Sequence, residues 1–473
     1  MKKTLSIFVF HIVLILNCSN IEAQFQLIEV LPGFNYADWY KAATGYTPNP
    51  QWFGAWVIAP HNDELYFGFA TARPAESDGG LLAKWTGDSL VSLGQFDEQG
   101  VHCLLWNKDT LYSMGSDPSR GDGWDGGNFY KYNPENGFVK MRYNDNNKPI
   151  LPNVVHSWGL CFDTISNRLY MGTGSYDPVQ YSKNGNNQCG NANDSTLACF
   201  GEIWQSSNYG YSWELISGKK PDVISTFRAM DVITYNNNIY EFNANADTPS
   251  DLKKSSDNGQ TWTVVPNVNL YVLWRMCVFQ NKLLAGADVG GKLYVIDENT
   301  SSSTITLPGA FNYSFNVFAN VDDRYLITYF TDGSVYATPD LSDWIQLIPP
   351  TGKKFLSIAY WENKQSIVLA ERDSIGKIWK VDISELLAIG IEKEVNKNEY
   401  VLSISRENVS IKNIDMEVTN IDLFNILGIN VSKLTSINRN LNNININTSQ
   451  LPPGVYLIVL NHKGKYNSFK FIK

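Results

Sequence analysis

The sequence predicts an all-β protein, a seven-bladed β-propeller followed by a small Ig-like β-sandwich, and three observations support this fold class. Only 18% of the 473 residues are charged whereas 13% are aromatic, and 35 Gly and 19 Pro are available for turns. A unit of four short strands recurs seven times, and the composition changes near residue 398. This profile excludes a coiled coil, a disordered chain and a basic nucleic-acid-binding protein.

The first 23 residues are organised like a secretory signal peptide. Two lysines precede an apolar run from Leu5 to Leu16, and a small-residue cleavage site ends at Ala23. The run is too short to anchor the chain in a bilayer. Cys18 offers a lipoprotein alternative, although the residue before it is a poor match to such sites. The sequence therefore predicts export, with a mature chain that begins at Gln24.

Residues 24–389 contain the repeat that predicts the propeller. In each unit the second strand is marked by a pair of the type Leu-Tyr, preceded by one apolar strand and followed by two more. These pairs begin at Leu65, Leu111, Leu169, Ile239, Leu283, Leu326 and Ile367, with spacings of 46, 58, 70, 44, 43 and 41 residues. A period just above 40 residues with four strands per unit is typical of propeller blades.

The ends of the repeat indicate how the ring closes. No convincing fourth strand follows the last unit, whose third strand is expected over residues 377–383. The segment Phe25–Pro32 is similar in pattern to fourth strands elsewhere, such as Trp344–Pro349. We therefore expect the N-terminal strand to complete the seventh blade, which leaves no open sheet edge. A linker over residues 390–397 then leads to the C-terminal domain, residues 398–473.

Two units carry a further turn motif. One copy is complete, with Ser255, Asp257, Gly259, Thr261 and Trp262, and the other is degenerate, with Asn208, Gly210 and Trp213. The motif resembles the Asp-box of sialidase-like propellers, which implies a structural turn between the third and fourth strands. An aspartate accepts turn hydrogen bonds, a glycine permits positive φ, and a tryptophan packs between blades. The Phe-Arg-Ile-Pro segment of sialidases is absent, so sialidase activity is not favoured.

The C-terminal 75 or so residues are rich in Asn, Ile, Val and Lys and lack Trp. They contain Leu451-Pro452-Pro453-Gly454-Val455-Tyr456 and end in a lysine-rich strand. These residues resemble the C-terminal sorting domain of type IX secretion substrates. The resemblance implies passage across the outer membrane, followed by cleavage of the domain or attachment at the cell surface.

Loop lengths predict where a functional site lies. In a propeller, the loops that enter the first strands and the loops between second and third strands gather on one face, and such loops often carry function. These loops are long in the first four units and short in the last three. We therefore expect an asymmetric cleft over blades 1–4. The long loops cover residues 35–51, 71–79, 116–127, 175–198 and 244–252.

Residues near the starts of the first strands supply the candidate site. The candidate ligand-binding residues are Trp52, Trp158, Arg228, Trp274 and Arg275, with Phe53, His102, His156 and Phe315 at similar positions. Aromatic rings stack on the apolar faces of sugars, and guanidinium groups pair with carboxylates or sulfates. The same residues could instead simply fill the channel.

An enzymatic alternative uses the scarce histidines. If the protein is catalytic, His102 or His156 would be the general base and Tyr211 or Tyr271 the acid in β-elimination from an acidic polysaccharide. Arg228 or Arg275 would then neutralise the uronate. The residues do not decide between this lyase and a protein that only binds glycans. A third hypothesis is a scaffold for a surface complex.

Other features bound the cofactors and partners. Cys189 and Cys199 flank a Gly/Asn-rich stretch and are expected to form a disulfide, whereas Cys103, Cys161 and Cys277 are expected to be buried free thiols. No cofactor is expected, although the acidic loop 117–125 could hold a structural Ca²⁺. The net charge is −9 although residues 390–473 carry +3, so the propeller is acidic and nucleic acid is not an expected partner. No transmembrane segment is expected.

Overall fold

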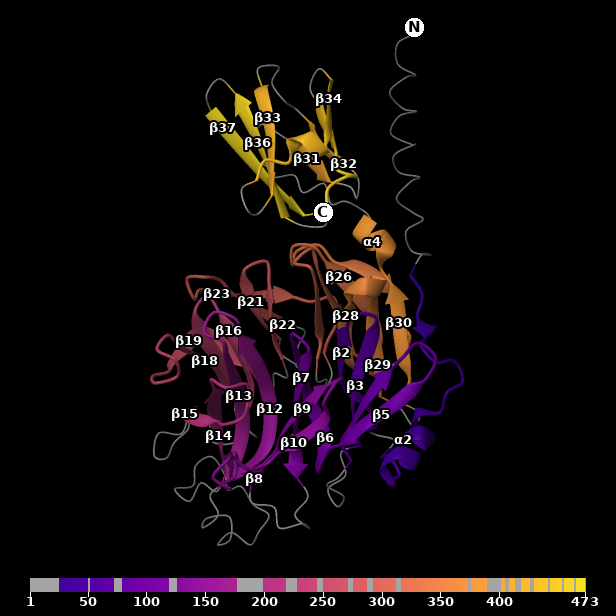
Figure 1. Cartoon of the computed structure of the whole chain (residues 1–473), viewed down its shortest axis with the longest axis vertical. Coiled ribbons are helices and arrows are strands. Elements are labelled where there is room, and N and C mark those ends of the chain that lie inside the picture. The colour runs from indigo at the N-terminus through magenta and orange to yellow at the C-terminus, as the bar shows by residue number, and fades with distance from the viewer. Residues whose placement is uncertain are drawn as a thin grey trace. The chain divides into compact units, whose positions relative to one another are not determined.

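Figure 1 shows the computed structural model of the chain. The structure describes residues 25–49, 52–71, 79–118, 126–176, 199–217, 228–244, 250–270, 275–286, 292–311, 316–372, 376–388, 401–404, 408–412, 418–425, 429–440, 443–452, 455–462 and 465–472. The chain divides into two compact units, Met1–Asp382 and Ile383–Lys473. The expected linker, residues 390–397, lies outside the described residues.

The first unit is a seven-bladed propeller, so the predicted fold class is confirmed. The first strands are β2 (Gly54–His61), β6 (Glu98–Asn107), β12 (Val154–Asp163), β16 (Arg228–Tyr235), β20 (Met276–Phe279), β24 (Phe318–Val321) and β28 (Phe355–Trp361). Each first strand contacts the first strands of both neighbouring blades, and β28 contacts β2. These strands therefore form a closed inner ring.

The remaining strands follow antiparallel in each blade. The second strands are β3 (Glu64–Ala70), β7 (Thr110–Pro118), β13 (Arg168–Tyr176), β17 (Asn238–Ala244), β21 (Lys282–Gly286), β25 (Tyr325–Tyr329) and β29 (Ser366–Glu371). The third strands are β4 (Leu81–Trp85), β9 (Phe129–Asn133), β14 (Cys199–Ser206), β18 (Ser250–Ser255), β22 (Lys292–Ile296), β26 (Val335–Thr338) and β30 (Ile378–Asp382). The fourth strands are β5 (Leu90–Gln95), β10 (Gly137–Met141), β15 (Glu214–Ser217), β19 (Thr263–Leu270), β23 (Ser302–Thr306), β27 (Ile345–Ile348) and β1 (Ile28–Glu29). All seven repeat anchors lie in second strands.

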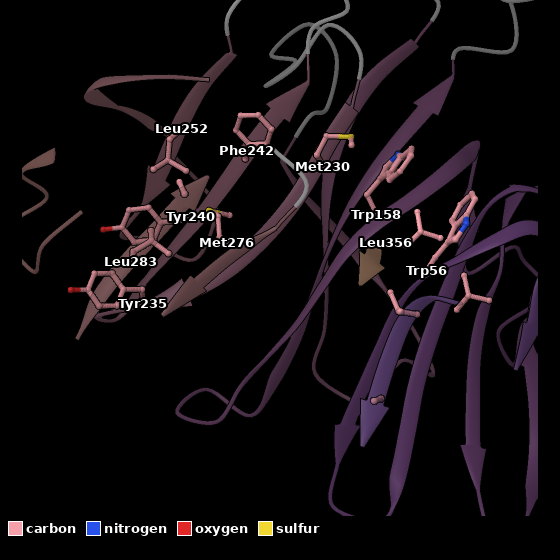
Figure 2. Packing of buried hydrophobic residues seen from close by; sticks show 14 of the residues in the cluster. Trp56, Trp158, Met230, Tyr235, Tyr240, Phe242, Leu252, Met276, Leu283 and Leu356 are labelled. Carbon is pink, nitrogen blue, oxygen red and sulfur yellow. The ribbon is translucent and has the colours of Figure 1, made fainter. Parts of the chain in front are cut away.

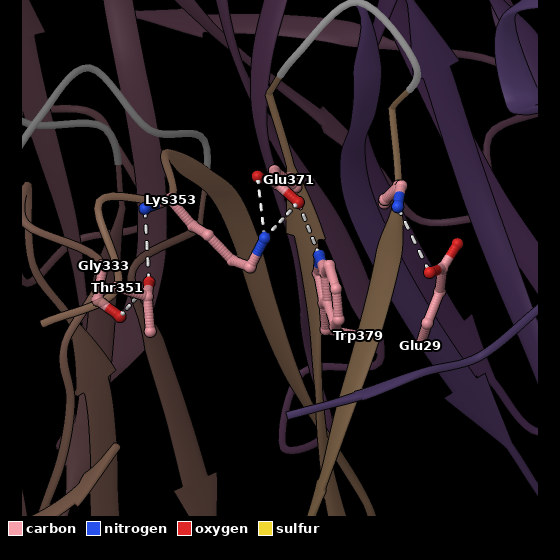
Figure 3. Close-up of polar contacts among 7 residues, drawn as sticks. Glu29, Gly333, Thr351, Lys353, Glu371 and Trp379 are labelled. Carbon is pink, nitrogen blue, oxygen red and sulfur yellow. Dashed lines mark hydrogen bonds and ion pairs between the residues drawn. The ribbon is translucent and has the colours of Figure 1, made fainter. Parts of the chain in front are cut away.

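The N-terminal strand completes the last blade. Strand β1 pairs with β30 through Ile28 opposite Lys380 and Glu29 opposite Trp379. The Lys377 ammonium lies 3.2 Å from a Glu29 carboxylate oxygen and fastens this outer edge (Figure 3). The following helix α2 (Tyr36–Thr44) is capped by the Asn35 side chain, which accepts a hydrogen bond from the backbone N–H of Asp38.

Close packing between blades explains the glycine at position 159 of the inner ring. A Cβ atom at Gly159 would lie 2.6 Å from the Cα of Asp231 and 2.7 Å from the backbone nitrogen of Val232. The backbones of β12 and β16 therefore approach more closely than any side chain at position 159 permits. Large apolar residues fill the spaces between other strands, among them Tyr240, Phe242 and Leu283 (Figure 2).

Short elements complete the first unit and one helix follows it. Strands β8 (Gly126–Gly127) and β11 (Leu151–Pro152) pair with each other, and the 3₁₀ helix η2 spans Glu362–Lys364. Helix α4 (Ser384–Ala388) follows β30. A bridge between His156 and Ser116 connects the sheets of blades 2 and 3.

The second unit is a small β-sandwich. One sheet has the order β31 (Val401–Ile404), β32 (Asn408–Lys412), β35 (Asn443–Asn447), β34 (Ser436–Asn440). The other has the order β33 (Val418–Asn425), β36 (Val455–His462), β37 (Lys465–Ile472), and a 3₁₀ helix η3 spans Ser432–Leu434. The two sheets share one apolar core that includes Ile411, Leu423, Ile446 and Ile458.

Candidate functional site

The blade topology places the start of every first strand at the same end of the propeller as the loops that connect the second and third strands. We call this the channel-mouth end, and the opposite end, with the other turns, the turn end. In an antiparallel blade the first strand starts where the second strand stops, so residues at these positions gather together. The described charged and aromatic residues at the channel-mouth end include Trp52, His156, Arg228, Arg275, Lys353 and Arg372.

An aromatic row, formed by Trp52, Trp56, His102 and Trp158, crosses blades 1, 2 and 3. The Trp56 indole N–H donates to the backbone carbonyl of Trp52 at 2.9 Å. The His102 ring lies between Trp56 and Trp158. Its centroid is 5.0 Å from that of Trp56 and 4.0 Å from that of Trp158. Figure 2 shows both tryptophans, with Met230 and Leu356 of other blades. The row is thus a packed structure that joins three blades.

Burial makes His102 a poor catalytic candidate. Its side chain is 1% exposed, and its Nε2 atom lies 2.6 Å from the Ser116 hydroxyl. Trp158 is 6% exposed. Substrate has to come within hydrogen-bond distance of a general base, and a ring buried between two indoles does not allow this approach. In this structure His102 and most of Trp158 serve the packing of the inner ring.

His156 and Arg228 form a more accessible pair at the end of this row. Both are half-buried, and an Arg228 guanidinium nitrogen lies 3.2 Å from Nε2 of His156. Arginine has only donors, so the His156 Nε2 accepts the hydrogen bond and this imidazole is neutral in the arrangement. The guanidinium also lies 5.0 Å from the Trp158 ring, within the range of a cation–π contact. The structure therefore brings together three of the expected site residues.

Arg275 has a different role from the one expected. One guanidinium nitrogen lies 3.4 Å from the Asp231 carboxylate, and the other donates to the backbone carbonyl of His102. Arg275 precedes blade 5 whereas His102 belongs to blade 2, so the side chain spans the channel. The second Asp231 oxygen accepts from the backbone N–H of Met276 at 2.6 Å. Arg275 therefore connects blades 2, 4 and 5 across the channel.

Blade 7 contributes cations that sequence reasoning missed. The Arg372 guanidinium lies 5.0 Å from the Trp52 ring. Close by in sequence, Glu371 accepts from the Trp379 indole at 2.7 Å and pairs with the Lys353 ammonium at 3.3 Å (Figure 3). The expected cleft lay over blades 1–4, and the other candidates stood at the starts of first strands, so a residue after the second strand of blade 7 was not among them. The signal that could have revealed Arg372 is its position directly after a second strand, beside the start of blade 1 in a closed ring.

Several expected site residues are not part of this cluster. Tyr211 lies in the turn after β14, at the turn end, because Ser206 pairs with Leu169 whereas His156 pairs with Gly174. This register separates the two levels by about 17 Å at about 3.3 Å per residue. The pairing of Tyr211 as acid with a histidine base is therefore wrong. Phe53 precedes β2, but its side chain is fully buried against Tyr40 and Phe69.

Other expectations fall outside the described residues. These are Tyr271, Trp274, Phe315, Cys189, most of the long loops and most of the acidic loop 117–125. Among the described residues no group of His, Cys, Asp and Glu could hold a metal ion. Within the same part of the chain no helix is long and apolar enough to cross a membrane.

The three cysteines of the inner strands are free thiols, as expected, and they are half-buried rather than fully buried. Burial raises the pKa of Cys103 to about 11 and that of Cys277 to about 12. Burial also raises the pKa of Cys161, and the nearby Asp231 adds to the effect. Because the thiolate is the reactive form, these thiols are inert near neutral pH.

Three buried carboxyl groups have raised pKa values. Burial raises the pKa of Glu98 to about 7, although the Tyr130 hydroxyl and the Asn128 amide donate to it. Burial also raises the pKa of Glu202 to about 7, against hydrogen bonds from Ser175 and Trp204. The pKa of Asp231 rises to about 6 by burial, despite its pairing with Arg275. Burial therefore makes all three groups easier to protonate in the folded state than in the unfolded chain.

These carboxyls predict an unusual dependence of stability on pH. A carboxyl group whose pKa is higher in the folded state than in the unfolded chain stabilises the fold while it is protonated. This stabilisation is complete below the pKa of the unfolded chain, about 4, and is lost as the pH rises through 6 to 7. One unit corresponds to about 1.4 kcal/mol. We expect the melting temperature to increase as the pH is lowered from 8 to 5. In the Glu202→Gln variant this increase should be smaller. A melting temperature that falls steadily over this range would contradict the assignment.

Comparison with known proteins identifies the second unit. Residues 401–473 match the family described as the secretion system C-terminal sorting domain. Such a domain directs a protein to the type IX secretion machinery, so the chain is delivered to the cell surface or the medium. No curated protein matches the chain.

Solved structures similar to this chain are distant in sequence. A streptogramin B lyase is 11% identical, with a TM-score of 0.46 over 77% of this chain and 99% of the lyase. A virginiamycin B lyase from Staphylococcus aureus is 9% identical, with a TM-score of 0.46 over 76% and 99%. The Pan2 WD40 domain of Neurospora crassa is 9% identical, with a TM-score of 0.43 over 70% and 89%. At these identities the likeness concerns the fold alone.

Proposed function

We propose that this exported propeller binds an acidic carbohydrate at its channel-mouth end. The observation that carries the proposal is the pair of cation–aromatic contacts at the two ends of the aromatic row. Arg372 lies over Trp52 in blade 1, and Arg228 lies over Trp158 in blade 3. Export to the cell surface is in keeping with an extracellular ligand. The expected signal peptide, residues 1–23, fits the same route.

The chemistry of these pairs suits an acidic sugar. A guanidinium that stacks on an indole is held in a fixed plane, and the N–H groups at its edge match the geometry of a carboxylate or sulfate. The half-buried Trp52 ring offers an apolar surface to a sugar face. Lys353 lies in the same blade as Arg372, but its charge is balanced by Glu371, so the proposal uses the charge of the two arginines. A uronate- or sulfate-bearing glycan therefore fits better than a neutral one.

A lyase that acts on the same glycan is the second candidate. It is favoured by the adjacency of His156 and Arg228, since β-elimination requires a base beside a group that neutralises the uronate. However, the Nε2 lone pair of His156 is occupied by Arg228, so the base needs Arg228 to move before it can accept a proton. No described tyrosine of the expected set lies beside His156 to act as acid. Binding without chemistry is the simpler role for this geometry.

One experiment separates the two functions. The full chain is incubated with uronate-containing polysaccharides while ultraviolet absorbance from unsaturated product and ligand retention are both recorded. The His156→Ala variant is the test, and Arg168→Ala, at the turn end, is the control. We expect retention without absorbance change, and at most a few-fold weaker retention in His156→Ala. Absorbance that grows with wild type and disappears in His156→Ala would establish the lyase. If no glycan is retained, a scaffold for a surface complex becomes the leading hypothesis.

A further inference from the structure

Two turns at the turn end of the propeller have the same hydrogen-bonded framework. The blade-3 turn spans residues 206–213 and the blade-4 turn spans residues 255–262. In both, the first serine hydroxyl accepts from the backbone N–H of the glycine four residues later at 2.8 Å. In both, the third residue, Asn208 or Asp257, accepts from the backbone N–H four residues later at 2.9 Å. The framework therefore does not depend on the residues between these positions.

The turns differ at two outward positions. The blade-3 turn carries Tyr209 and Tyr211, which are 37% and 61% exposed, whereas the blade-4 turn carries Asn258 and Gln260. Tyr209 has φ of +58° and Asn258 has φ of +60°. This left-handed region is tolerated by asparagine and is unfavourable for a bulky side chain. The stability of the turn alone would favour asparagine at positions 209 and 258. The tyrosine at position 209 therefore calls for another explanation.

Both tyrosine rings are held in fixed positions. The Lys131 ammonium lies 3.4 Å from the Tyr211 ring centroid and 5.9 Å from that of Tyr112. The Tyr209 hydroxyl exchanges two hydrogen bonds with the Asn167 amide, at 2.9 and 3.1 Å. The Tyr209 ring also stacks on Phe162 at 6.3 Å. Exposed rings that are already ordered lose little freedom when a ligand binds.

We propose that Tyr209 and Tyr211 form a second carbohydrate-binding site, which takes a neutral sugar unit at the turn end of blade 3. An aromatic face stacks on the apolar face of a pyranose, and the Asn167 amide is suited to sugar hydroxyls. The size of the patch agrees with this ligand. A tyrosine contributes about 150–250 Å², so two rings remain well below the roughly 800 Å² per partner of a stable protein interface.

This site is independent of the channel-mouth proposal. It lies at the other end of blade 3, because Ser206 is level with Leu169 whereas His156 is level with Gly174. Its chemistry also differs, since the rings are paired with an amide and a lysine rather than with arginines. Burial lowers the pKa of Lys131 to about 8, which reduces its positive charge at mildly alkaline pH and disfavours a purely ionic role.

The blade-4 turn supplies the matched variant for the test. Tyr209→Asn combined with Tyr211→Gln converts the blade-3 turn into the blade-4 sequence at these positions. Affinity electrophoresis of the full chain is carried out in gels that contain soluble neutral glucans, xylans or mannans. We expect wild type to be retarded by at least one of them and the double variant to lose at least tenfold in affinity. Asparagine tolerates this φ, and this gain should offset the contacts with Asn167 and Lys131 that the variant loses, so we expect only a small change in the melting temperature.

Controls distinguish this proposal from the channel-mouth one. Arg228→Ala combined with Arg372→Ala should leave retardation by neutral glycans unchanged. The proposal is overturned if wild type is not retarded by any neutral glycan, or if the double tyrosine variant is retarded equally. Capture of a protein partner that is lost in the double tyrosine variant would also overturn it, because the patch would then be a protein contact.

Discussion

Arg275→Ala is expected to lower the free energy of unfolding by about 3–5 kcal/mol at pH 8, since removal of one partner leaves a buried charge uncompensated. The variant leaves Asp231 buried without its guanidinium and removes the donor to the His102 carbonyl. Blades 2, 4 and 5 then lose the contacts that Arg275 makes across the channel. Chemical denaturation at pH 8, monitored by tryptophan fluorescence, measures the effect.

An exposed ion pair provides the control for this prediction. Lys364 and Asp63 lie 2.8 Å apart, but their side chains are 48% and 69% exposed, so Lys364→Ala should cost less than about 1 kcal/mol. The cost of Arg275→Ala should also shrink at pH 5, where Asp231, whose pKa is about 6, becomes protonated and neutral. An equal decrease in the free energy of unfolding for the two variants, or a decrease that does not depend on pH, would show that the contacts of Arg275 do not stabilise the propeller.

Arg228→Ala combined with Arg372→Ala is expected to weaken binding of an acidic oligosaccharide by about 100-fold. A hydrogen bond to a charged group contributes about 1.5–3 kcal/mol, and about 1.4 kcal/mol corresponds to a factor of ten. Each single variant should lose roughly tenfold. The double variant also loses two cation–π contacts and the hydrogen bond to His156, so we expect a small decrease in melting temperature beside the loss of binding.

The control has the same change of charge as each single variant, but at another place. Arg168 donates to Gln205 at 3.1 Å and lies at the turn end of blade 3. Arg168→Ala should therefore leave the dissociation constant within about twofold of wild type, which is a small difference on the scale of tenfold per 1.4 kcal/mol. If Arg168→Ala weakens binding as much as Arg228→Ala or Arg372→Ala alone does, the effect is general electrostatic attraction rather than contact at the channel mouth.

The propeller could be predicted from the sequence because each blade is built from its own stretch of chain. The Leu-Tyr pairs mark second strands directly, and the spacing between them reflects one four-stranded sheet per unit. The strand near Ile28 was recognisable because the last unit lacks a fourth strand. The pairing of His156 with Arg228 could also be anticipated, since both residues stand near the starts of neighbouring first strands.

The rest of the site depends on ring closure, which brings together residues that are far apart in sequence. Arg372 meets Trp52 only because blade 7 lies beside blade 1, and Arg275 reaches His102 only across the channel. Neither contact has a local pattern. The interpretation of Tyr211 as a catalytic acid failed for a related reason, because residue type was considered without the end of the blade at which the residue lies.

The most direct test of acidic-glycan binding at the channel mouth is calorimetric titration with two matched oligosaccharides. One contains uronates, and the other is the same oligosaccharide after its carboxyl groups are reduced to alcohols. The account predicts that the full chain binds the uronate form at least tenfold more tightly, and that this preference disappears in the Arg228→Ala, Arg372→Ala double variant. Equal affinity for the two oligosaccharides, or a preference that survives in the double variant, would contradict it.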